Sequence, residues 1–104
     1  MRGLMKTKAQ KILKVVSKIP EGKVMTYGEV AKACGLSCPR YIGFVLHNNP
    51  DPAKYSCHRV VNFQGKVAKS YAFGGENIQR QKLEEEGIVF CDNKIDLKKY
   101  SFHM

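Results

Sequence analysis

The chain has 104 residues, of which 43 % are apolar, and its 18 Lys and Arg residues outnumber nine Asp and Glu residues. This length fits one domain around a single core, residues 1–104, with no companion N-terminal domain. No apolar run approaches the roughly 20 residues that span a bilayer, and the basic start lacks the hydrophobic region of a secretion signal. We therefore expect a monomer without membrane association, located in the cytoplasm or, in a eukaryote, in the nucleus.

The net charge of +9 is concentrated near the N-terminus, where lysines crowd the first quarter of the chain: Lys6, Lys8, Lys11, Lys14, Lys18 and Lys23. This distribution favours a polyanionic partner, although charge alone does not distinguish DNA, RNA and a membrane surface, and it also suits a solubilising surface. The four cysteines, Cys34, Cys38, Cys57 and Cys91, lack the paired C-x-x-C spacings of a zinc site. We expect reduced thiols and no bound metal.

Two amphipathic helices are predicted in the first third of the chain. A Thr-x-x-Gln or Thr-x-x-Glu capping box opens each of them, at Thr7 and at Thr26. Apolar residues then repeat at helical spacing, with lysines on the other face of the first helix. Pro20 ends the first helix and Gly35 ends the second.

A third helix is predicted over "PRYIGFVLHN", because Pro39 suits a first helical turn. Two short helices joined by a Gly-containing turn are typical of a helix-turn-helix, whose second helix enters a DNA groove with its N-terminal residues leading. Arg40 in the first turn opposes the helix dipole unless an anion lies nearby. Gly43 costs about 1 kcal/mol relative to alanine, which close approach of a nucleic-acid backbone or of a neighbouring helix would explain.

The second half of the chain predicts a small β element and a further helix. Prolines and Asn or Asp residues make 48–53 a loop. "HRVV" and "KVA" flank the turn "NFQG" and predict a β-hairpin, the wing of a winged helix. The connector "SYAFGG" at 70–75 precedes a helix that ends at Gly87. The fold class is therefore mainly α with a small β-hairpin wing, a winged helix-turn-helix domain for DNA binding.

Cys57 is the candidate nucleophile, since it is followed by His58 and Arg59, a base and a positive charge of the kind that activate a thiol. A histidine base needs a carboxylate to orient it. On a helical wheel, Glu86 projects towards the apolar face, between Ile78 and Leu83, whereas its two neighbouring glutamates project away. Metal ligation or burial in the core for Cys57, and a solvated helix end for Glu86, remain open alternatives at this point.

Five segments in the same order resemble the C-terminal domain of the O6-alkylguanine-DNA alkyltransferases, the methylated-DNA–protein-cysteine methyltransferases: "IPEGKVMTYGEVAKACG", "PRYIGFVLHNNP", "SCHRVV", "GG" and "LEEEG". The resemblance spans about residues 10–90. It implies repair of double-stranded DNA containing O6-alkylguanine, by minor-groove binding and flipping of the damaged base. The alkyl group would pass irreversibly to the protein, which is consumed, with no metal or organic cofactor.

The resemblance also implies catalytic roles for particular residues. Cys57 matches the alkyl acceptor, His58 its water-linked base, and Glu86 the carboxylate partner of that histidine. Asn49 matches the asparagine that shapes the active-site turn. The connector lacks the serine that the family carries just before its glycine pair, so Tyr71 or a backbone N–H would donate to the alkylated oxygen instead.

For DNA binding, Tyr27 matches the tyrosine that presses on the target phosphate and helps to rotate the nucleotide out. Arg40 matches the arginine that fills the gap left in the base stack, and Gly43 fits a close approach to the minor groove. His47 has no matching role in the family and is expected at most to line the groove. Because Tyr27 also lies on the apolar stripe of its helix, a packing role competes with the DNA-binding role.

Two further features set the chain apart from the alkyltransferases. Ser56 replaces the usual proline before the acceptor cysteine, and "QRQKLEEEGIVF" and "DLKKY" resemble the short alkyltransferase-like proteins. Those relatives bind alkylated guanine and hand it to nucleotide excision repair, and they usually carry tryptophan or another residue in place of the cysteine. Because Cys57, His58 and Glu86 are all present, we expect an alkyltransferase. The alternatives are a non-catalytic lesion sensor that meets nucleotide excision repair proteins, and a winged-helix transcription factor.

Overall fold

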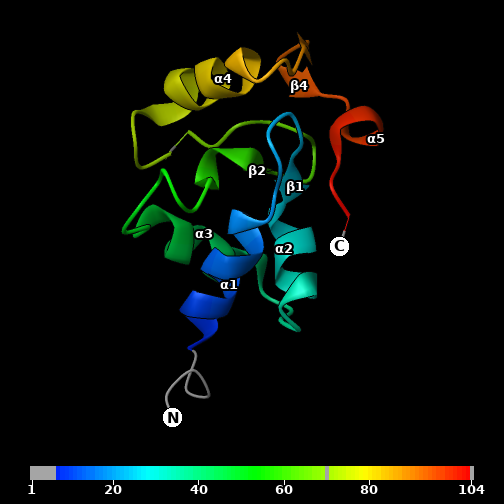
Figure 1. Cartoon of the computed structure of the whole chain (residues 1–104). Coiled ribbons are helices and arrows are strands. Elements are labelled where there is room, and N and C mark those ends of the chain that lie inside the picture. The colour runs from blue at the N-terminus through cyan, green and yellow to red at the C-terminus, as the bar shows by residue number, and fades with distance from the viewer. Residues whose placement is uncertain (1–6, 70, 104) are drawn as a thin grey trace.

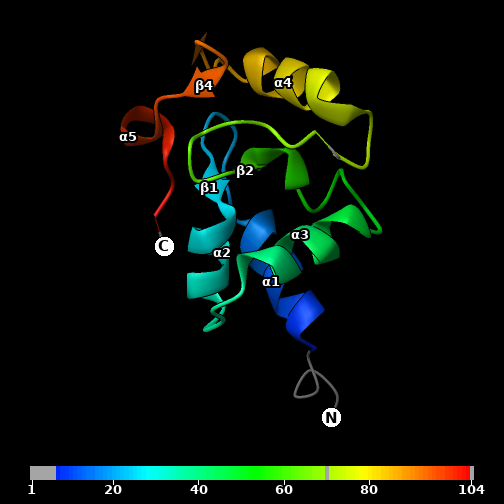
Figure 2. The same ribbon diagram turned by 180° about the vertical axis from the view of Figure 1, so that it is seen from behind.

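The computed structural model describes residues 7–69 and 71–103, so Lys6 of the basic first quarter and Ser70 of the connector lie outside the described residues. The elements follow in chain order: α1 (Lys8–Ser17), β1 (Met25–Thr26), α2 (Tyr27–Ala33), α3 (Pro39–His47), the 3-10 turn η2 (Cys57–Arg59), β2 (Val60–Val61), α4 (Gly75–Glu85), β3 (Phe90–Cys91), β4 (Lys94–Ile95) and α5 (Leu97–Tyr100). Helices α1, α2 and α3 gather at one end of the molecule and α4 lies across the other, with β1 and β2 between them (Figures 1 and 2).

The first three helices form where the sequence predicts them. Both capping boxes are present, at Thr7 and Thr26, and in each the threonine hydroxyl accepts a backbone N–H at 3.1 Å. Gly35, with φ of +73°, follows the C-terminus of α2, a backbone conformation that favours glycine. Pro39 opens α3. The helix-turn-helix is thus built from local signals along the chain.

Two apolar clusters lie on opposite faces of the β1–β2 pair. Met25 and Val60 belong to the larger cluster, which α1, α2 and α3 share, whereas Val24 and Val61 belong to the cluster under α4 and the C-terminal segment. Successive side chains of a strand point to opposite faces, so two adjacent valines can each be fully buried. Burial of each such side chain stabilises the fold by about 1.5–3 kcal/mol.

The expectation of a small strand pair in a mainly helical domain is confirmed, but the hairpin expected over residues 58–68 is wrong in its pairing. β2 pairs in parallel with β1 and not with residues 66–68, which form no strand. The intervening turn is closed locally, because the Asn62 N–H donates to the Lys66 carbonyl at 3.0 Å and the Asn62 Oδ1 accepts the Lys66 N–H at 2.9 Å.

A buried side chain from α4 explains why this hairpin does not form. The Gln79 Nε2 donates to the carbonyls of His58 and Val60, at 3.1 and 3.0 Å, and its Oε1 accepts the Ala68 N–H at 2.8 Å. These are backbone groups of the two segments that a hairpin would pair with each other. Gln79, only 1 % exposed, therefore joins the two segments and fixes both to α4.

The C-terminal residues complete the second cluster. β3 and β4 form an antiparallel pair whose turn places Asp92 and Asn93 at φ of 53° and 62°, the left-handed region that tight hairpin turns require. The Ile95 N–H donates to the Gly65 carbonyl at 2.9 Å, and a Cβ at Gly65 would lie only 2.5 Å from the Ile95 carbonyl oxygen. Glycine is therefore required at 65, where this pair meets the turn after β2.

No helix within residues 7–69 and 71–103 is long and apolar enough to cross a membrane.

Candidate active site

The turn that carries Cys57 is braced by Asn49, which lies two residues after the end of α3. The Asn49 Nδ2 donates to the Tyr55 carbonyl at 2.8 Å, and its Oδ1 accepts the Asp51 N–H at 2.9 Å. The side chain is buried, so these bonds are protected from water. The sequence suggested that Asn49 shapes this turn, and the structure places it where it can do so.

Cys57 begins the η2 turn and lies in the larger apolar cluster, with only 5 % of its surface exposed. Burial raises the pKa of the Cys57 thiol above its ordinary value, because it disfavours the thiolate. The Asn49 side chain, the positive charge of Lys82 and the Tyr71 hydroxyl act in the opposite direction and stabilise the thiolate. The sulfur is therefore a thiol in an apolar setting that polar groups can help to ionise.

His58 and Glu86 meet as the sequence predicted. The His58 Nε2 lies 2.7 Å from the Glu86 Oε2, and each side chain is only 12 % exposed. Glu86 follows directly on α4, and its neighbours Glu84 and Glu85 face the solvent. The helical wheel was wrong about one residue of the buried face of α4. Ile78 is exposed, and Gln79 shares that face with Leu83.

Arg59 is a second partner of Glu86 that sequence reasoning missed. Its Nε and Nη2 contact the Glu86 carboxylate at 2.9 and 2.8 Å, a two-pronged geometry that suits a guanidinium. The Arg59 Nη1 also donates to the Ile19 carbonyl at 2.8 Å, and the Gly22 N–H donates to Glu86 at 3.2 Å. The network thus ties the active-site turn to α4 and to the loop after α1.

Burial, followed by the charges around it, sets the protonation of His58. Burial alone would raise the Glu86 pKa, but hydrogen bonds from Arg59, His58 and the Gly22 N–H hold it below its ordinary value, so Glu86 is an anion at neutral pH. The pKa of His58 is lowered, first by burial and then by the positive charges of Arg59 and Lys82, which together outweigh Glu86. A neutral His58 that donates its Nε2–H to Glu86 leaves Nδ1 as a proton acceptor.

Ser56 adopts the backbone shape that proline would impose. Its φ is −74°, within the range of proline, and the residue is buried. Its hydroxyl accepts a hydrogen bond from the Arg59 Nη1 at 3.2 Å. The hydrogen bond from Arg59 to Ser56 therefore holds the turn before Cys57, at the position where the alkyltransferases have the ring of a proline.

Lys82 was also missed by the sequence reading, which treated the lysines as a general surface charge. It lies on α4, one helical turn before Glu86, and its Nζ is 3.1 Å from the Tyr71 hydroxyl oxygen. With His58 and Glu86, it lines a cavity of about 520 Å³. The sequence offered one sign of this position, because Lys82 precedes the inward-facing Glu86 by four residues and so lies on the same side of the helix.

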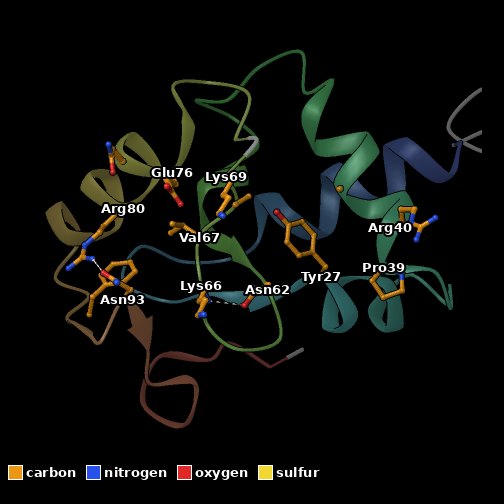
Figure 3. A pocket seen from close by; sticks show the side chains of 14 residues that line it. Tyr27, Pro39, Arg40, Asn62, Lys66, Val67, Lys69, Glu76, Arg80 and Asn93 are labelled. Atoms are coloured by element: carbon orange, nitrogen blue, oxygen red, sulfur yellow. Dashed lines mark hydrogen bonds between the residues drawn. The ribbon is translucent and has the colours of Figure 1, made fainter.

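Three of the four expected DNA-binding residues, Tyr27, Arg40 and Gly43, line a larger cavity of about 870 Å³. Tyr27 and Arg40 lie on the helix-turn-helix side, Arg80 and Asn93 lie on the opposite side, and the segment after β2 passes between them (Figure 3). Tyr27 is half-buried against the larger apolar cluster, so it has both the packing contact and the cavity position that the sequence left open. Burial raises the pKa of Tyr27, which keeps its hydroxyl protonated as a donor.

Gly43 does not serve close helix packing. A Cβ built there would approach Tyr27 Cε1 at 4.0 Å, an ordinary van der Waals distance, and would meet no other part of the described chain more closely. The absent side chain instead leaves space on the cavity side of α3. His47, near the end of the same helix, is exposed and lies outside the residues that line this cavity.

Cys57 lines neither of these two cavities. After burial, a negative charge on the Cys57 sulfur is a further cause that raises the pKa of both Tyr27 and Tyr71. Within the described ranges, the cysteines are free, and no three His, Cys, Asp or Glu side chains gather closely enough to hold a metal ion.

Comparison with known proteins supports the resemblance. The family model for the 6-O-methylguanine DNA methyltransferase DNA-binding domain matches residues 7–88. A DNA base-flipping protein of Vibrio parahaemolyticus is 42 % identical over 95 residues, covering 88 % of this chain and 91 % of that protein. A methylated-DNA–protein-cysteine methyltransferase of Methanothermobacter thermautotrophicus is 42 % identical over 79 residues, which cover 76 % of this chain but 43 % of that protein.

The structure of Schizosaccharomyces pombe Atl1 in complex with damaged DNA containing O6-carboxymethylguanine is similar to 96 % of this chain, over the whole of that chain. The TM-score is 0.82 and the sequence identity is 32 %.

Proposed function

Because the chain belongs to the family of 6-O-methylguanine DNA methyltransferase DNA-binding domains, we propose that it repairs double-stranded DNA containing O6-alkylguanine by accepting the alkyl group on Cys57. The observation that carries this proposal is the complete set of Cys57, a neutral His58 and the Glu86 carboxylate 2.7 Å from it. Lesion binding alone requires neither a thiol nor an oriented, neutral histidine, whereas alkyl transfer requires both.

The chemistry balances without a cofactor. The Cys57 thiol gives its proton through a bridging water to the His58 Nδ1, and the sulfur attacks the alkyl carbon of O6-alkylguanine. A carbon–sulfur bond forms while the carbon–oxygen bond breaks, and its electron pair stays on the guanine oxygen. The guanine takes up the proton on its ring nitrogen. The thioether product has no ready route back to a thiol, so each molecule reacts once.

DNA binding is assigned to the face that carries the larger cavity. Tyr27, Arg40 and Gly43 line this cavity, and the N-terminal turn of α3, with Arg40, leads into the groove. Flipping the base out costs a few kcal/mol of stacking, which insertion of the Arg40 side chain offsets. The net charge of +9 favours the phosphate backbone. Solved relatives bound to DNA support this partner.

The second candidate is a lesion sensor that binds O6-alkylguanine and presents it to nucleotide excision repair proteins. Two observations favour it: the names of the relatives, a DNA base-flipping protein and an alkyltransferase-like protein, and the 5 % exposure of Cys57. Both candidates share DNA binding and base flipping, and they differ only in whether the sulfur is alkylated.

The deciding experiment is to incubate the protein with a duplex that contains one O6-methylguanine and to map methylated peptides by mass spectrometry. We expect one methyl group per molecule on Cys57, unmodified guanine in the product, and no transfer to the Cys57→Ser variant. Tight binding to the lesion without a methyl group on Cys57 would replace the alkyltransferase with the sensor. Preference for one undamaged sequence over the lesion would point to a transcription factor.

Gly43→Ala is expected to separate stability from DNA binding. Alanine in place of glycine inside α3 raises the free energy of unfolding by roughly 0.5–1 kcal/mol, because it restricts the unfolded chain and meets only Tyr27 at 4.0 Å. The added methyl group holds the DNA backbone away, which costs on the order of 1 kcal/mol, or about fivefold in Kd.

Thermal unfolding and fluorescence anisotropy with a lesion duplex measure the two effects. Gly28→Ala is the matched control, since Gly28 lies on α2 outside the cavity and is expected to gain stability without losing affinity. Unchanged DNA affinity in Gly43→Ala would remove Gly43 from the interface.

A further inference from the structure

Lys82 turns away from the acidic residues of its own helix. Glu85 and Glu86 follow it by three and four residues, the spacings at which a helical lysine pairs with a carboxylate. Yet within the described residues none of the ion pairs includes Lys82, and Glu86 is taken up by Arg59 and His58. The Lys82 Nζ instead lies 3.1 Å from the Tyr71 hydroxyl oxygen and 5.5 Å from the centre of the Tyr71 ring.

The direction of the Lys82–Tyr71 hydrogen bond follows from the groups involved. An ammonium group has donors only, so the Tyr71 oxygen accepts from Lys82. The single hydroxyl proton of Tyr71 is then free to donate elsewhere. Tyr71 packs in the same apolar cluster as Cys57, and its side chain interacts with the Cys57 sulfur. The Lys82 charge can therefore act on the sulfur through the Tyr71 hydroxyl, which packs in the same cluster.

We propose that Lys82 is a positioning residue for alkyl transfer, which acts through the Tyr71 hydroxyl to stabilise negative charge on the Cys57 sulfur. This inference deepens the proposed function, because it names what ionises a thiol that burial keeps protonated. In this role Lys82 acts on the sulfur through Tyr71 and needs no contact with the alkyl group or the guanine. Once the sulfur has become a thioether, a weak acceptor, the Tyr71 hydroxyl can donate to the departing guanine oxygen instead.

The other groups around Cys57 do not supply this charge. Asn49, from the end of α3, is neutral. His58 is neutral because its pKa is lowered, and Tyr27 of α2 stays protonated because its pKa is raised. Arg59 is positive, but the Glu86 carboxylate compensates it at 2.8 Å. Lys82 brings positive charge to the sulfur from α4, the helix that the Gln79 and Glu86 contacts fix against the active-site turn.

The test follows the titration of Cys57 in the full chain, labelled with carbon-13 at the cysteine Cβ, by NMR between pH 6 and 11. The Cys57 signal is assigned by its loss in Cys57→Ser. Lys82→Met and Tyr71→Phe are expected to move the Cys57 midpoint to higher pH, whereas Lys82→Arg keeps it close to that of the unchanged protein. Lys98→Met, which removes an exposed lysine from α5, is the matched control for net charge and leaves the midpoint in place.

Methyl transfer provides the second readout. At pH 7 the rate for Lys82→Met is expected to fall by about three- to tenfold, because the thiolate fraction below the pKa decreases in proportion to the shift. The loss shrinks as the pH is raised, which a merely structural role of Lys82 would not produce. If Lys82→Met does not fold, Lys82→Gln serves in its place.

Two results would overturn the inference. One is a Cys57 midpoint that is the same in Lys82→Met and Lys98→Met. The other is a midpoint that moves in Lys82→Met but not in Tyr71→Phe, since Lys82 would then not act through Tyr71. A protein that binds the lesion without accepting a methyl group refutes the proposed function but leaves the titration result standing, so the two failures are distinguishable.

Discussion

Replacing Glu86 with glutamine is expected to lower the free energy of unfolding by about 3 kcal/mol at pH 7, because it leaves the Arg59 charge partly buried without a counterion. The carboxylate accepts hydrogen bonds from Arg59, His58 and the Gly22 N–H, and the side chains of Glu86 and Arg59 are only 12 % and 14 % exposed. A glutamine amide has only one acceptor oxygen for these donors. Its NH2 group cannot accept a hydrogen bond, so at least one donor would lose its partner.

The same substitution is expected to slow methyl transfer by about 100-fold or more, a loss of the size associated with a misdirected general base. Without the carboxylate, the tautomer and orientation of His58 are no longer fixed, so its Nδ1 is not held ready to accept the thiol proton. Chemical denaturation at pH 7 and single-turnover transfer kinetics measure the two effects.

The stability loss in Glu86→Gln depends on pH with a definite sign. Because the Glu86 pKa is depressed in the fold, its contribution is fully present above its ordinary value of about 4.3 and is lost as the pH falls through the folded value. The difference between the unchanged protein and Glu86→Gln therefore shrinks below about pH 4. The depressed His58 pKa acts earlier, since the unfolded chain takes up a proton below about pH 6.5 that the folded chain does not.

Glu85→Gln is the matched control, because the neighbouring carboxylate is exposed and its removal is expected to change stability by less than about 0.5 kcal/mol. Equal stability losses for the two substitutions would show that the Glu86 contacts contribute nothing beyond surface charge. Loss of stability in Glu86→Gln with unchanged methyl transfer would remove the carboxylate from catalysis and leave it a structural role.

Gln79→Leu is expected to lower the free energy of unfolding by about 3 kcal/mol or more, although it places an apolar side chain in an apolar cluster. Each buried backbone group left without a partner costs about 1–3 kcal/mol, and Gln79 serves the His58 and Val60 carbonyls and the Ala68 N–H. For a domain of this size, such a loss lowers Tm by roughly 10–20 °C. Methyl transfer is expected to fall as well, because Gln79 fixes the turn that carries His58 against α4.

Differential scanning calorimetry of Gln79→Leu and Gln81→Leu measures this effect. Gln81 lies on the exposed face of the same helix, so its substitution carries the same change in composition without the buried contacts. If the Tm values of the two variants agree within about 2–3 °C, the difference in stability between them is less than about 1 kcal/mol. That result would contradict the role assigned to Gln79.

Much of the fold follows from local signals. The capping boxes at Thr7 and Thr26 and the opening of α3 at Pro39 each depend on residues within a few positions of one another, so the sequence predicts them directly. The inward position of Glu86 follows from helical periodicity in the same way. The residue types at Cys57, His58 and Glu86 likewise indicate a nucleophile, its base and an orienting carboxylate.

The hairpin expected after Cys57 failed for a physical reason. A strand pattern shows that a segment can form hydrogen bonds in an extended conformation, but it does not specify its partner. β2 pairs with a strand from the first quarter of the chain, with Met25 opposite Val60. The Gln79 side chain forms hydrogen bonds with the Val60 carbonyl and the Ala68 N–H, which belong to the two segments of the expected hairpin. A polar residue on a helix of mixed composition gives no local sign that it will be buried to this extent.

The amino-acid sequence by itself determined the helix-turn-helix, the candidate nucleophile and its base, and the family to which they point, because these depend on spacings of a few residues. The tertiary structure alone decided that Arg59 pairs with Glu86, that burial lowers the pKa of His58, and that Lys82 reaches Tyr71 rather than its own helical neighbours. Charge and hydrogen bonding gain strength where water is excluded, and which groups share such a place depends on segments far apart in the chain meeting in space.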